Sequence, residues 1–284
     1  GWGGDTPFAL DDDVPIVTAE QLNLPLIDLS AVVLEGGAIE IDGQGTLMAT
    51  RSSITGDDRN PGLTETEIEG YFAAYLGVEQ VIWLDGQFGG SEDITDQHID
   101  GFVKFAGGNT IVTMSNPDLA YWYVDAQDRN KIAQAENASG TPYIRVNLPL
   151  TQNPVQTTWG LDLGFRSSYV NYYVGNEVVL VPEYNDPMDV TALDIVQELY
   201  PSRTAVGINC QNMLQWGGMV HCVTQQQPSG TTSLSIPGLT PATHLGDGTE
   251  WLDLMGRKVS LPQPGHMYIQ RDQNGRTKKV IGAE

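Results

Sequence analysis

The stretch AVVLEGGAIEIDGQGTLMAT, residues 31–50, contains two apolar segments separated by Asp42-Gly43-Gln44-Gly45. Glycine tolerates the positive φ angles that a tight turn between two strands requires. The stretch therefore predicts a hairpin with strands at residues 31–40 and 46–50.

A bend, a helix and a third strand are expected after this hairpin. Arg59-Asn60-Pro61 marks the bend, because proline interrupts regular structure. Thr64 and Glu67 have the spacing of a capping box, in which each side chain accepts a hydrogen bond from the backbone of the other residue. Gly77 is placed to end the helix, and the apolar residues 81–84 return as a strand.

The same order of elements occurs twice more along the chain. The second unit is expected to have strands at 100–105, 110–114 and 143–146 and a helix at 125–136. The third is expected to have strands at 169–174, 178–181 and 205–208, with a helix that begins at Asp186-Pro187 and ends before Pro201. Three consecutive strand–strand–helix–strand units constitute an internal repeat.

Partial units flank the three complete ones. Residues 1–30 resemble the second half of an earlier unit, and residues 219–226 resemble the first strand of a later one. Repeated units of this kind need neighbours to bury their apolar faces. The predicted fold class is α/β, with five ββαβ units in a ring whose first unit is incomplete. The predicted domains are 1–228, a linker at 229–248 and a basic β segment at 249–284.

The chain is strongly acidic. It has 36 Asp and Glu residues against 14 Lys and Arg residues, a net charge of −22 over 284 residues. This charge argues against a nucleic-acid partner and favours cationic ligands, although a solvated acidic surface is the commoner explanation. No apolar run approaches the roughly 20 residues of a membrane span, and the sequence indicates no cofactor. The start at Gly1, without an initiator Met, suggests a fragment or a processed product.

Cys222 is the candidate nucleophile. It lies in the segment WGGMVHCVTQQQP, residues 216–228, behind a Gly-Gly turn and before a polar run. This setting is typical of a thiol at the mouth of a pocket. The chain has only one other cysteine, so the sequence predicts neither a disulfide framework nor a metal site.

Four polar residues are expected to lie near this thiol. His98 and Asp100 open the second unit and would project from one face of its first strand, because side chains two apart on a strand share a face. Glu35 occupies the matching strand of the first unit, and Asn171 that of the third. If the units superpose, all four side chains reach the same end of the innermost strands as Cys222.

Each candidate also has a plainer explanation. A single cysteine is most often an inert core residue, which is the expectation for Cys210, and Glu35 beside two glycines could simply accept hydrogen bonds in a turn. The acidic run that ends at Asp96 most simply forms a solvated loop, with Asp96 as a further candidate for ligand contact. The other histidines are expected to be structural: His221, His244 and His266.

A thiol, an imidazole and several carboxylates together suit one kind of substrate. The free thiol has a pKa of about 8.5, and neighbouring negative charge raises it, which is a poor arrangement for a peptidase. A guanidinium ion reverses this effect, because it neutralises the carboxylates and offers an electrophilic carbon to sulfur. An imidazole can then protonate the departing ammonia. A cysteine peptidase is the weaker alternative.

Several motifs, in order, resemble the agmatine deiminase family, which also contains the bacterial peptidylarginine deiminases. They are LEGG at 34–37, RNP at 59–61, TDQHID at 95–100, SYVNY at 168–172 and GGMVHCVTQQQP at 217–228. The resemblance extends over residues 1–228. It implies the five-bladed α/β propeller of the guanidine-modifying, or pentein, superfamily, and hydrolysis of a guanidinium group to a ureido group and ammonia without a cofactor.

The resemblance also implies a role for each site residue. Cys222 would be the nucleophile, His98 the general acid and base, Glu35 a carboxylate that orients His98 or binds the guanidinium, and Asp100 a guanidinium clamp. Asn171 and Asp96 would be further substrate contacts. The family's second clamp lies in a Trp-x-Arg-Asp-x-Gly-Pro motif that this sequence lacks, since Trp2-Gly3-Gly4 opens the chain.

The tail and the substrate leave alternatives open. Residues 252–281 resemble the C-terminal sorting segment of type IX secretion, which would place the protein outside the cell or on its surface; an ordinary basic β-hairpin is the alternative. The first expectation is conversion of agmatine to N-carbamoylputrescine. The alternatives are an exported enzyme acting on peptidyl-arginine and an inactive guanidinium-binding fragment. The sequence does not indicate the oligomeric state.

Overall fold

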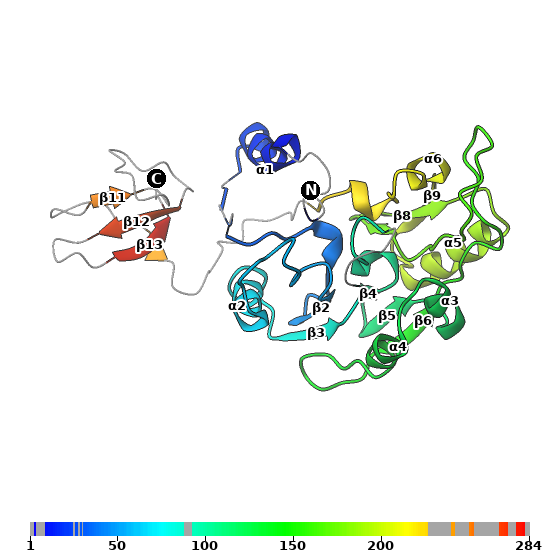
Figure 1. Ribbon diagram of the computed structural model, residues 1–284, viewed down its shortest axis with the longest axis horizontal. Helices are drawn as coiled ribbons and strands as arrows, with labels where there is room; N and C mark the ends of the chain where they lie inside the picture. The colour runs from blue at the N-terminus through cyan, green and yellow to red at the C-terminus, as the bar shows by residue number, and fades with distance from the viewer. Residues whose placement is uncertain are drawn as a thin grey trace. The chain divides into compact units, whose positions relative to one another are not determined.

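The computed structural model describes residues 3, 9–24, 26–27, 29, 31–87, 93–226, 240–241, 250–252, 267–271 and 277–281 (Figure 1). The chain divides into two compact units. One comprises residues 33–229, and the other comprises residues 3–32 together with 230–284.

The larger unit contains three mixed sheets of three strands each, in chain order (Figure 1). In every sheet the first strand pairs antiparallel with the second, and the second pairs parallel with the third. The strands are β1 (Ile39–Ile41), β2 (Thr46–Thr50) and β3 (Gln80–Leu84); β4 (Lys104–Ala106), β5 (Thr110–Thr113) and β6 (Ile144–Asn147); β7 (Tyr173–Val174), β8 (Val178–Glu183) and β9 (Thr204–Asn209).

Helices lie between the second and third strands of each sheet, as a parallel pair requires. They are α2 (Glu65–Leu76) in the first unit, α3 (Asn116–Tyr121) and α4 (Ala126–Ala133) in the second, and α5 (Met188–Leu199) in the third; α6 (Gln211–Leu214) follows. This order confirms an α/β fold with mixed sheets. In the described part of the chain the sheets are separate, and the ring of five units stays a prediction.

The capping signals of the first unit are confirmed. The Thr64 side chain accepts a hydrogen bond from the Glu67 backbone at 3.3 Å, and Glu67 accepts one from Thr64 N at 2.8 Å. Gly77 ends α2 in the left-handed region, at φ 69°. In the third unit, α5 begins at Met188 with Pro187 at its N-cap, one residue later than predicted, although Asp186 still accepts a hydrogen bond from Met188 N at 2.9 Å.

The innermost strands are shorter than predicted. The strands expected at 31–40, 100–105 and 169–174 survive only as β1, β4 and β7. Three 3-10 turns lie at the ends that face the site: η2 (Gly36–Ala38), η3 (Ile99–Gly101) and η4 (His221–Val223). The prediction of a strand at 219–226 is therefore wrong, because η4 occupies the centre of that segment. Local backbone hydrogen bonds, such as the one from Ala38 N to Glu35 O at 3.0 Å, replace the hydrogen bonds between strands there.

The apolar core of the larger unit falls into two clusters. One lies within the first repeat and includes Ile54, Ile68 and Phe72. The other is larger and contains mostly residues of the second and third repeats, such as Ile111 and Val181, together with Met48 and Leu84 of the first. The site described below draws residues from both parts.

The smaller unit contains helix α1 (Ala9–Leu22) and a four-stranded sheet. The strands are β10 (Thr240–Pro241), β11 (Glu250–Leu252), β12 (Met267–Arg271) and β13 (Thr277–Ile281), in the order β10-β13-β12-β11. The pair β12–β13 is antiparallel, which fits the predicted basic β segment. Among the described residues, no helix combines the length and the apolar character that a membrane crossing needs.

Candidate active site

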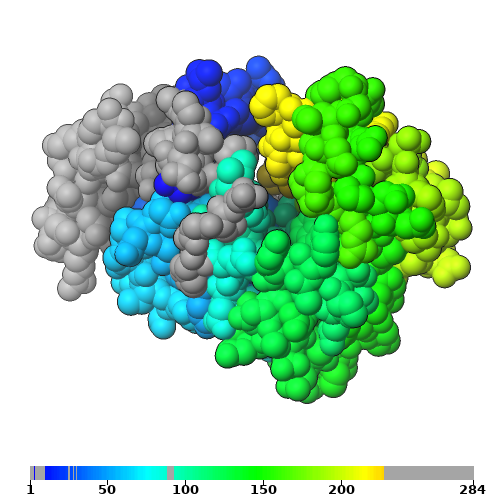
Figure 2. Space-filling view, turned by 45° about the vertical axis from the view of Figure 1, so that its right-hand side comes forward, coloured from blue at the N-terminus to red at the C-terminus, as the bar shows by residue number. Residues whose placement is uncertain are grey.

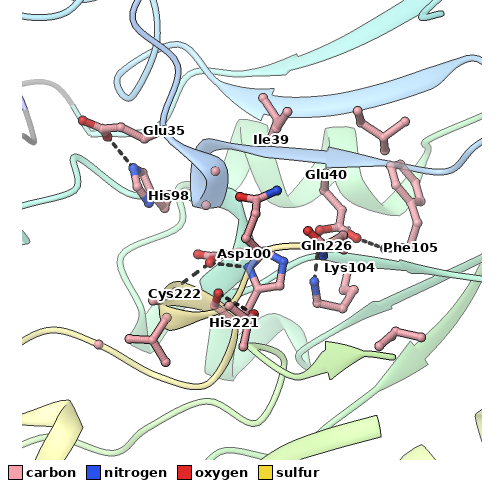
Figure 3. Close-up of a pocket in the computed structure, with 18 of the residues that line it drawn as sticks. Glu35, Ile39, Glu40, His98, Asp100, Lys104, Phe105, His221, Cys222 and Gln226 are labelled. Atoms are coloured by element: carbon pink, nitrogen blue, oxygen red, sulfur yellow. Dashed lines mark hydrogen bonds and ion pairs between the residues drawn. The ribbon is translucent and has the colours of Figure 1, made fainter. Parts of the chain in front are cut away.

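Glu35 and His98 form a close pair on one side of a cavity (Figure 3). Glu35 precedes η2 and His98 precedes η3, so each side chain leaves the backbone where a short turn begins. The distance from His98 Nε2 to Glu35 Oε2 is 2.6 Å. The prediction that His98 and Asp100 project from a strand is wrong, because the backbone turns at η3, yet both line the cavity.

Gly37 separates the two sides of the cavity. A Cβ atom at this position would lie 2.6 Å from His98 Nδ1 and 2.8 Å from Asp100 Oδ2. Both distances are too short for a side chain, so glycine leaves open the space between the imidazole and the carboxylate. A planar cation of guanidinium size needs such a space.

Arg59 forms an ion pair with Glu35. The sequence did not single out this arginine as a site residue. Its side chain is 0% exposed, and its Nε lies 3.3 Å from Glu35 Oε2. Its Nη1 donates to Asp58 at 2.7 Å and to Asp96 at 2.6 Å. Asp96, a predicted substrate contact, therefore pairs with an internal guanidinium, and it is not part of the cavity lining. The RNP motif was the signal that could have identified Arg59.

The charges around Glu35 keep its carboxylate ionised. Burial raises its pKa, but the hydrogen bond with His98 and the charge of Arg59 outweigh burial, so the pKa of Glu35 is lowered. An ionised Glu35 can hold the imidazole and stabilise positive charge on it.

Asp100 lies at the centre of the site. It is 2% exposed, and its Oδ2 lies 2.9 Å from His221 Nδ1 and 3.7 Å from Cys222 Sγ (Figure 3). Burial raises the pKa of Asp100, but the His221 hydrogen bond and the nearby His98 and Lys104 side chains produce a net lowering. His221, which the sequence predicted to be structural, therefore makes a hydrogen bond to Asp100, the proposed guanidinium clamp.

Asn171 links the segments around the thiol. It is 0% exposed. Its Nδ2 donates to Cys222 Sγ at 3.3 Å and to the Asp100 carbonyl at 3.4 Å, and its Oδ1 accepts from His221 N at 2.8 Å. These bonds occupy the amide, and Asn171 is not part of the cavity lining. Asn171 therefore contacts the Cys222 sulfur, and its contact with substrate stays a prediction.

The Cys222 thiol is weakly acidic in this structure. The residue is exposed as a whole, but its sulfur is crowded by Asp100 and Asn171. Partial burial and then the Asp100 charge raise the pKa of Cys222 to about 11, despite opposing hydrogen bonds from Met219 and Asn171. With this pKa, almost none of the thiol is ionised near neutral pH. Neutralisation of Asp100 by a bound cation would favour the thiolate.

The cavity has a volume of about 1160 Å³ and is lined by Glu35, His98, Asp100, His221 and Cys222 among others. The surface is hollowed where the cyan part of the chain meets the yellow segment that ends at Gln226 (Figure 2).

Another ion pair lies in the same cavity. Lys104 Nζ is 3.1 Å from Glu40 Oε2. Glu40 also accepts a hydrogen bond from Phe105 N at 3.0 Å. Because Glu40 balances Lys104, this lysine adds no uncompensated positive charge to the cavity.

The structure brings together Glu35, His98, Asp100, Asn171 and Cys222, which the sequence placed in matching positions of successive repeats. Cys210 is buried at the start of α6, and burial raises its pKa to about 11. His244 and His266 lie outside the described residues. No cluster of His, Cys, Asp and Glu in the described part of the chain could hold a metal ion.

Comparisons with known proteins give one consistent result. A model of the Porphyromonas-type peptidyl-arginine deiminase family matches residues 1–228. The agmatine deiminase of Pseudomonas syringae pv. tomato is 32% identical over 258 residues, which cover 80% of this chain and 67% of the relative. A solved agmatine deiminase of Enterococcus faecalis has a TM-score of 0.71 and 29% identity, covering 80% of this chain and 67% of its own. An agmatine deiminase of C. jejuni shares the fold, with a TM-score of 0.61 at 22% identity over 78% of this chain and 64% of its own.

Proposed function

Because this chain belongs to the Porphyromonas-type peptidyl-arginine deiminase family, an enzyme family, we propose that it hydrolyses the guanidinium group of a small cation, with agmatine as the first candidate. The products would be N-carbamoylputrescine and ammonia. One observation carries the proposal: the Cys222 thiol lies 3.7 Å from the buried Asp100 carboxylate, in a cavity that the His98–Glu35 pair also lines.

The first half of the reaction would form a covalent intermediate. Asp100 binds the guanidinium N–H groups, and the bound positive charge promotes transfer of the thiol proton to solvent. Sulfur forms a bond to the central carbon while the C=N π pair moves to nitrogen. His98 then gives a proton to that amine, the C–N bond breaks and ammonia leaves. Glu35 stabilises the imidazolium form of His98 in this step.

The second half would release the product. His98 takes a proton from water, and the resulting hydroxide adds to the carbon of the thiouronium. The C–S bond breaks, the thiol is restored and the ureido product leaves. The same imidazole therefore acts first as an acid and then as a base, while Glu35 and Arg59 hold its position.

Peptidyl-arginine is the second candidate substrate. Trp216 and Val223, both part of the cavity lining beside the thiol, are 76% and 65% exposed. Such apolar surface at the rim could pack against the backbone or the neighbouring side chains of a peptide. Guanidinium binding without hydrolysis is the remaining alternative.

The finer architecture also belongs to this proposal. The three ββαβ units support a five-bladed propeller in which two further blades are partial, and the motifs place the boundary of the catalytic domain near residue 228. The basic β segment from residue 249 would act as a sorting signal. Its test is fusion of 229–284 to a carrier protein with a signal peptide, followed by fractionation of a host with type IX secretion; a carrier that stays in the periplasm contradicts this role.

An ammonia-release assay tests the function. Agmatine, free arginine and an arginine-containing peptide are compared at equal concentration. Cys222→Ala is expected to abolish release while the fold is kept, whereas Cys210→Ala, at the other cysteine, should retain activity. Release from agmatine above the others supports the first candidate, and release from the peptide supports the second. Calorimetric binding of agmatine without any release would contradict hydrolysis.

A further inference from the structure

We propose that Thr50 and Ser52 are positioning residues for His98. Their hydroxyl groups hold the two residues before His98 in a left-handed conformation, and this conformation fixes the imidazole against Glu35. Neither Thr50 nor Ser52 is part of the cavity lining, so each acts through the backbone and not on the substrate. The inference rests on the proposed function, because it names what holds the imidazole that the reaction would use.

The segment before His98 has an unusual backbone. Asp96 has a φ angle of 53° and Gln97 one of 68°, both in the left-handed region. In the described part of the chain, no other two consecutive non-glycine residues have positive φ. A Cβ atom disfavours this region; aspartate adopts it more readily than most residues, but glutamine has no such tendency. The conformation therefore persists only if neighbouring groups hold it.

Two hydroxyl groups hold the backbone carbonyls of this segment. Thr50 Oγ1 donates to Gln97 O at 2.8 Å, and Ser52 Oγ donates to Asp96 O at 2.6 Å. Thr50 is the last residue of β2 and is 0% exposed, while Ser52 is 2% exposed, so water does not compete for either hydroxyl. Loss of either group would leave a backbone carbonyl without its donor.

The direction of the Ser52 bond follows from its second partner. The carbonyl of Asp96 can only accept, and the backbone N–H of Gln87 can only donate. Gln87 N lies 3.1 Å from Ser52 Oγ, so the hydroxyl accepts from Gln87 and gives its proton to Asp96. A Cβ atom on Gly86 would overlap Ser52 Oγ, so glycine allows the chain after β3 to approach this hydroxyl. Ser52 therefore connects the end of β3 to the segment before His98.

The side chains of the segment are anchored separately from its carbonyls. Arg59 Nη1 donates to the Asp96 carboxylate at 2.6 Å, and Gln97 Nε2 donates to Trp122 O at 3.2 Å. These bonds hold the ends of the side chains, whereas the hydroxyls hold the peptide groups that would turn if φ changed. Removal of the Thr50 hydroxyl therefore tests the backbone conformation without loss of either side-chain bond.

The position of His98 depends on this conformation. Its Nε2 lies 2.6 Å from Glu35 Oε2 (Figure 3). If Gln97 relaxed to an ordinary negative φ, the chain would enter His98 in another direction and the imidazole would move away from Glu35. A displacement of about 1 Å in a catalytic group costs roughly 100-fold in rate.

The main test is Thr50→Val in the full chain, because valine keeps the shape of threonine without its hydroxyl. Thr46→Val, at the other end of β2, is the matched control: Thr46 is also 0% exposed, and its hydroxyl accepts a bond from Ala138 N at 2.8 Å. In ammonia release from agmatine, Thr50→Val should lower kcat about 10- to 100-fold and change KM by less than about threefold. Thr46→Val should keep kcat within about threefold.

Conservative variants add a second comparison. Thr50→Ser keeps the donor to Gln97 O, so it should recover most of the kcat that Thr50→Val loses. Ser52→Ala removes the donor to Asp96 O and should give a loss of the same kind, again in kcat more than in KM. A Thr50→Ser protein no more active than Thr50→Val would overturn the proposal.

A glycine substitution separates positioning from a general loss of structure. Gln97→Gly removes the Cβ atom that disfavours the left-handed region, so the segment needs less support from Thr50. The loss caused by Thr50→Val should be at least about fivefold smaller in the Gln97→Gly background, given the cost of a left-handed residue with a side chain. An equal loss in both backgrounds would overturn the proposal.

NMR spectra of the resting protein give a readout that needs no turnover. The Glu35 carboxylate accepts a hydrogen bond from His98 Nε2, so this ring proton should give a low-field signal that is absent in His98→Gln. The signal should shift or disappear in Thr50→Val and remain in Thr46→Val. An unchanged signal in Thr50→Val would overturn the proposal, even if no guanidinium compound is hydrolysed and the proposed function fails.

A measurement on the unsubstituted protein covers the case in which Thr50→Val does not fold. Because the Thr50 hydroxyl is buried and bonded to Gln97 O, its proton should exchange with water slowly enough to give its own NMR signal. A hydroxyl proton that exchanges too fast to be observed would also overturn the proposal.

Discussion

The two halves of the site are held in place by different kinds of interaction. The imidazole half, which we define as Glu35, His98 and Arg59, depends on buried charges, with the Arg59 side chain 0% exposed. The sulfur half, defined as Cys222, Asn171, Asp100 and His221, places the Cys222 sulfur against a neutral amide at 3.3 Å.

The two halves therefore differ in what a bound cation would change. The imidazole half is charged and organised without substrate, because Arg59 and His98 lower the pKa of Glu35. The sulfur half is organised but not activated, because burial and Asp100 raise the pKa of Cys222 to about 11. A bound cation would favour the Cys222 thiolate and so would activate the sulfur half only.

The largest expected effect comes from removal of the internal guanidinium. Arg59→Gln leaves Glu35, Asp58 and Asp96 without their shared cation, and loss of one partner of a buried ion pair costs about 3–5 kcal/mol of unfolding free energy. Arg51→Gln is the matched control, because the Arg51 pair with Glu65 is partly exposed and should contribute at most about 1 kcal/mol. Urea unfolding of both variants measures the difference.

The same variant should also be more sensitive to acid. The pKa of Glu35 is lowered in the folded protein, so its contribution to stability is present above its ordinary pKa and is lost as pH falls through the lowered value. Without Arg59, this loss begins at higher pH. An acid-unfolding midpoint equal to that of the unsubstituted protein would show that the imidazole half does not depend on Arg59.

The next effect concerns the space between the halves. Gly37→Ala places a Cβ 2.6 Å from His98 Nδ1, whereas the matched change Gly36→Ala meets its nearest atom, in Gln225, at 3.8 Å. A displacement of about 1 Å in a catalytic group costs roughly 100-fold in rate. Ammonia release should therefore fall by at least about that factor in Gly37→Ala and by much less in Gly36→Ala. Equal losses in the two variants would argue against a guanidinium site between His98 and Asp100.

A third prediction tests whether a bound cation lowers the pKa of the Cys222 thiol. Alkylation by uncharged iodoacetamide should rise with pH toward the Cys222 pKa of about 11. Cationic chloroacetamidine, which can bind to Asp100, should show an apparent pKa lower by at least about one unit, because a bound positive charge favours the thiolate. Matching pH profiles for the two reagents would mean that the cation does not activate the sulfur half.

The sequence predicted the residues of both halves better than the backbone that carries them. Glycine turns and the capping box at Thr64 are local signals, and they located the hairpins and α2. The 3-10 turns at η2, η3 and η4 were missed because apolar residues beside the site have the composition of strands, while contacts between repeats bend the chain. Period-two alternation does not place His98 and Asp100, since His98 is the N-cap of η3 and Asp100 lies within it.

Partners that lie far apart in the sequence were also beyond local reasoning. Arg59 lies 24 positions from Glu35 and His221 lies 121 positions from Asp100, so no spacing rule joins them. His221 was set aside because a single histidine is usually structural. Its position next to Cys222 was the available signal, and it becomes informative only once Asp100 is known to face the same cavity.

The smallest predicted effect tests whether His221 acts through Asp100. In His221→Asn, the side-chain N–H can replace Nδ1 as the donor to Asp100 Oδ2, whereas His221→Leu removes the donor and leaves Asp100 buried without it. Loss of that bond raises the pKa of Asp100 and weakens its hold on a cation. The leucine variant should raise KM for agmatine about tenfold at neutral pH with a smaller change in kcat, and the asparagine variant should recover most of the loss.

The pH dependence distinguishes this effect from a general loss of structure. Because the His221 bond lowers the pKa of Asp100, its absence should move the acidic limb of kcat/KM upward in the leucine variant and leave the basic limb in place. If both limbs moved together, or if the asparagine variant behaved like the leucine variant, His221 would be acting on the whole sulfur half. The neutral donor Asn171 would then no longer be sufficient to explain how that half is organised.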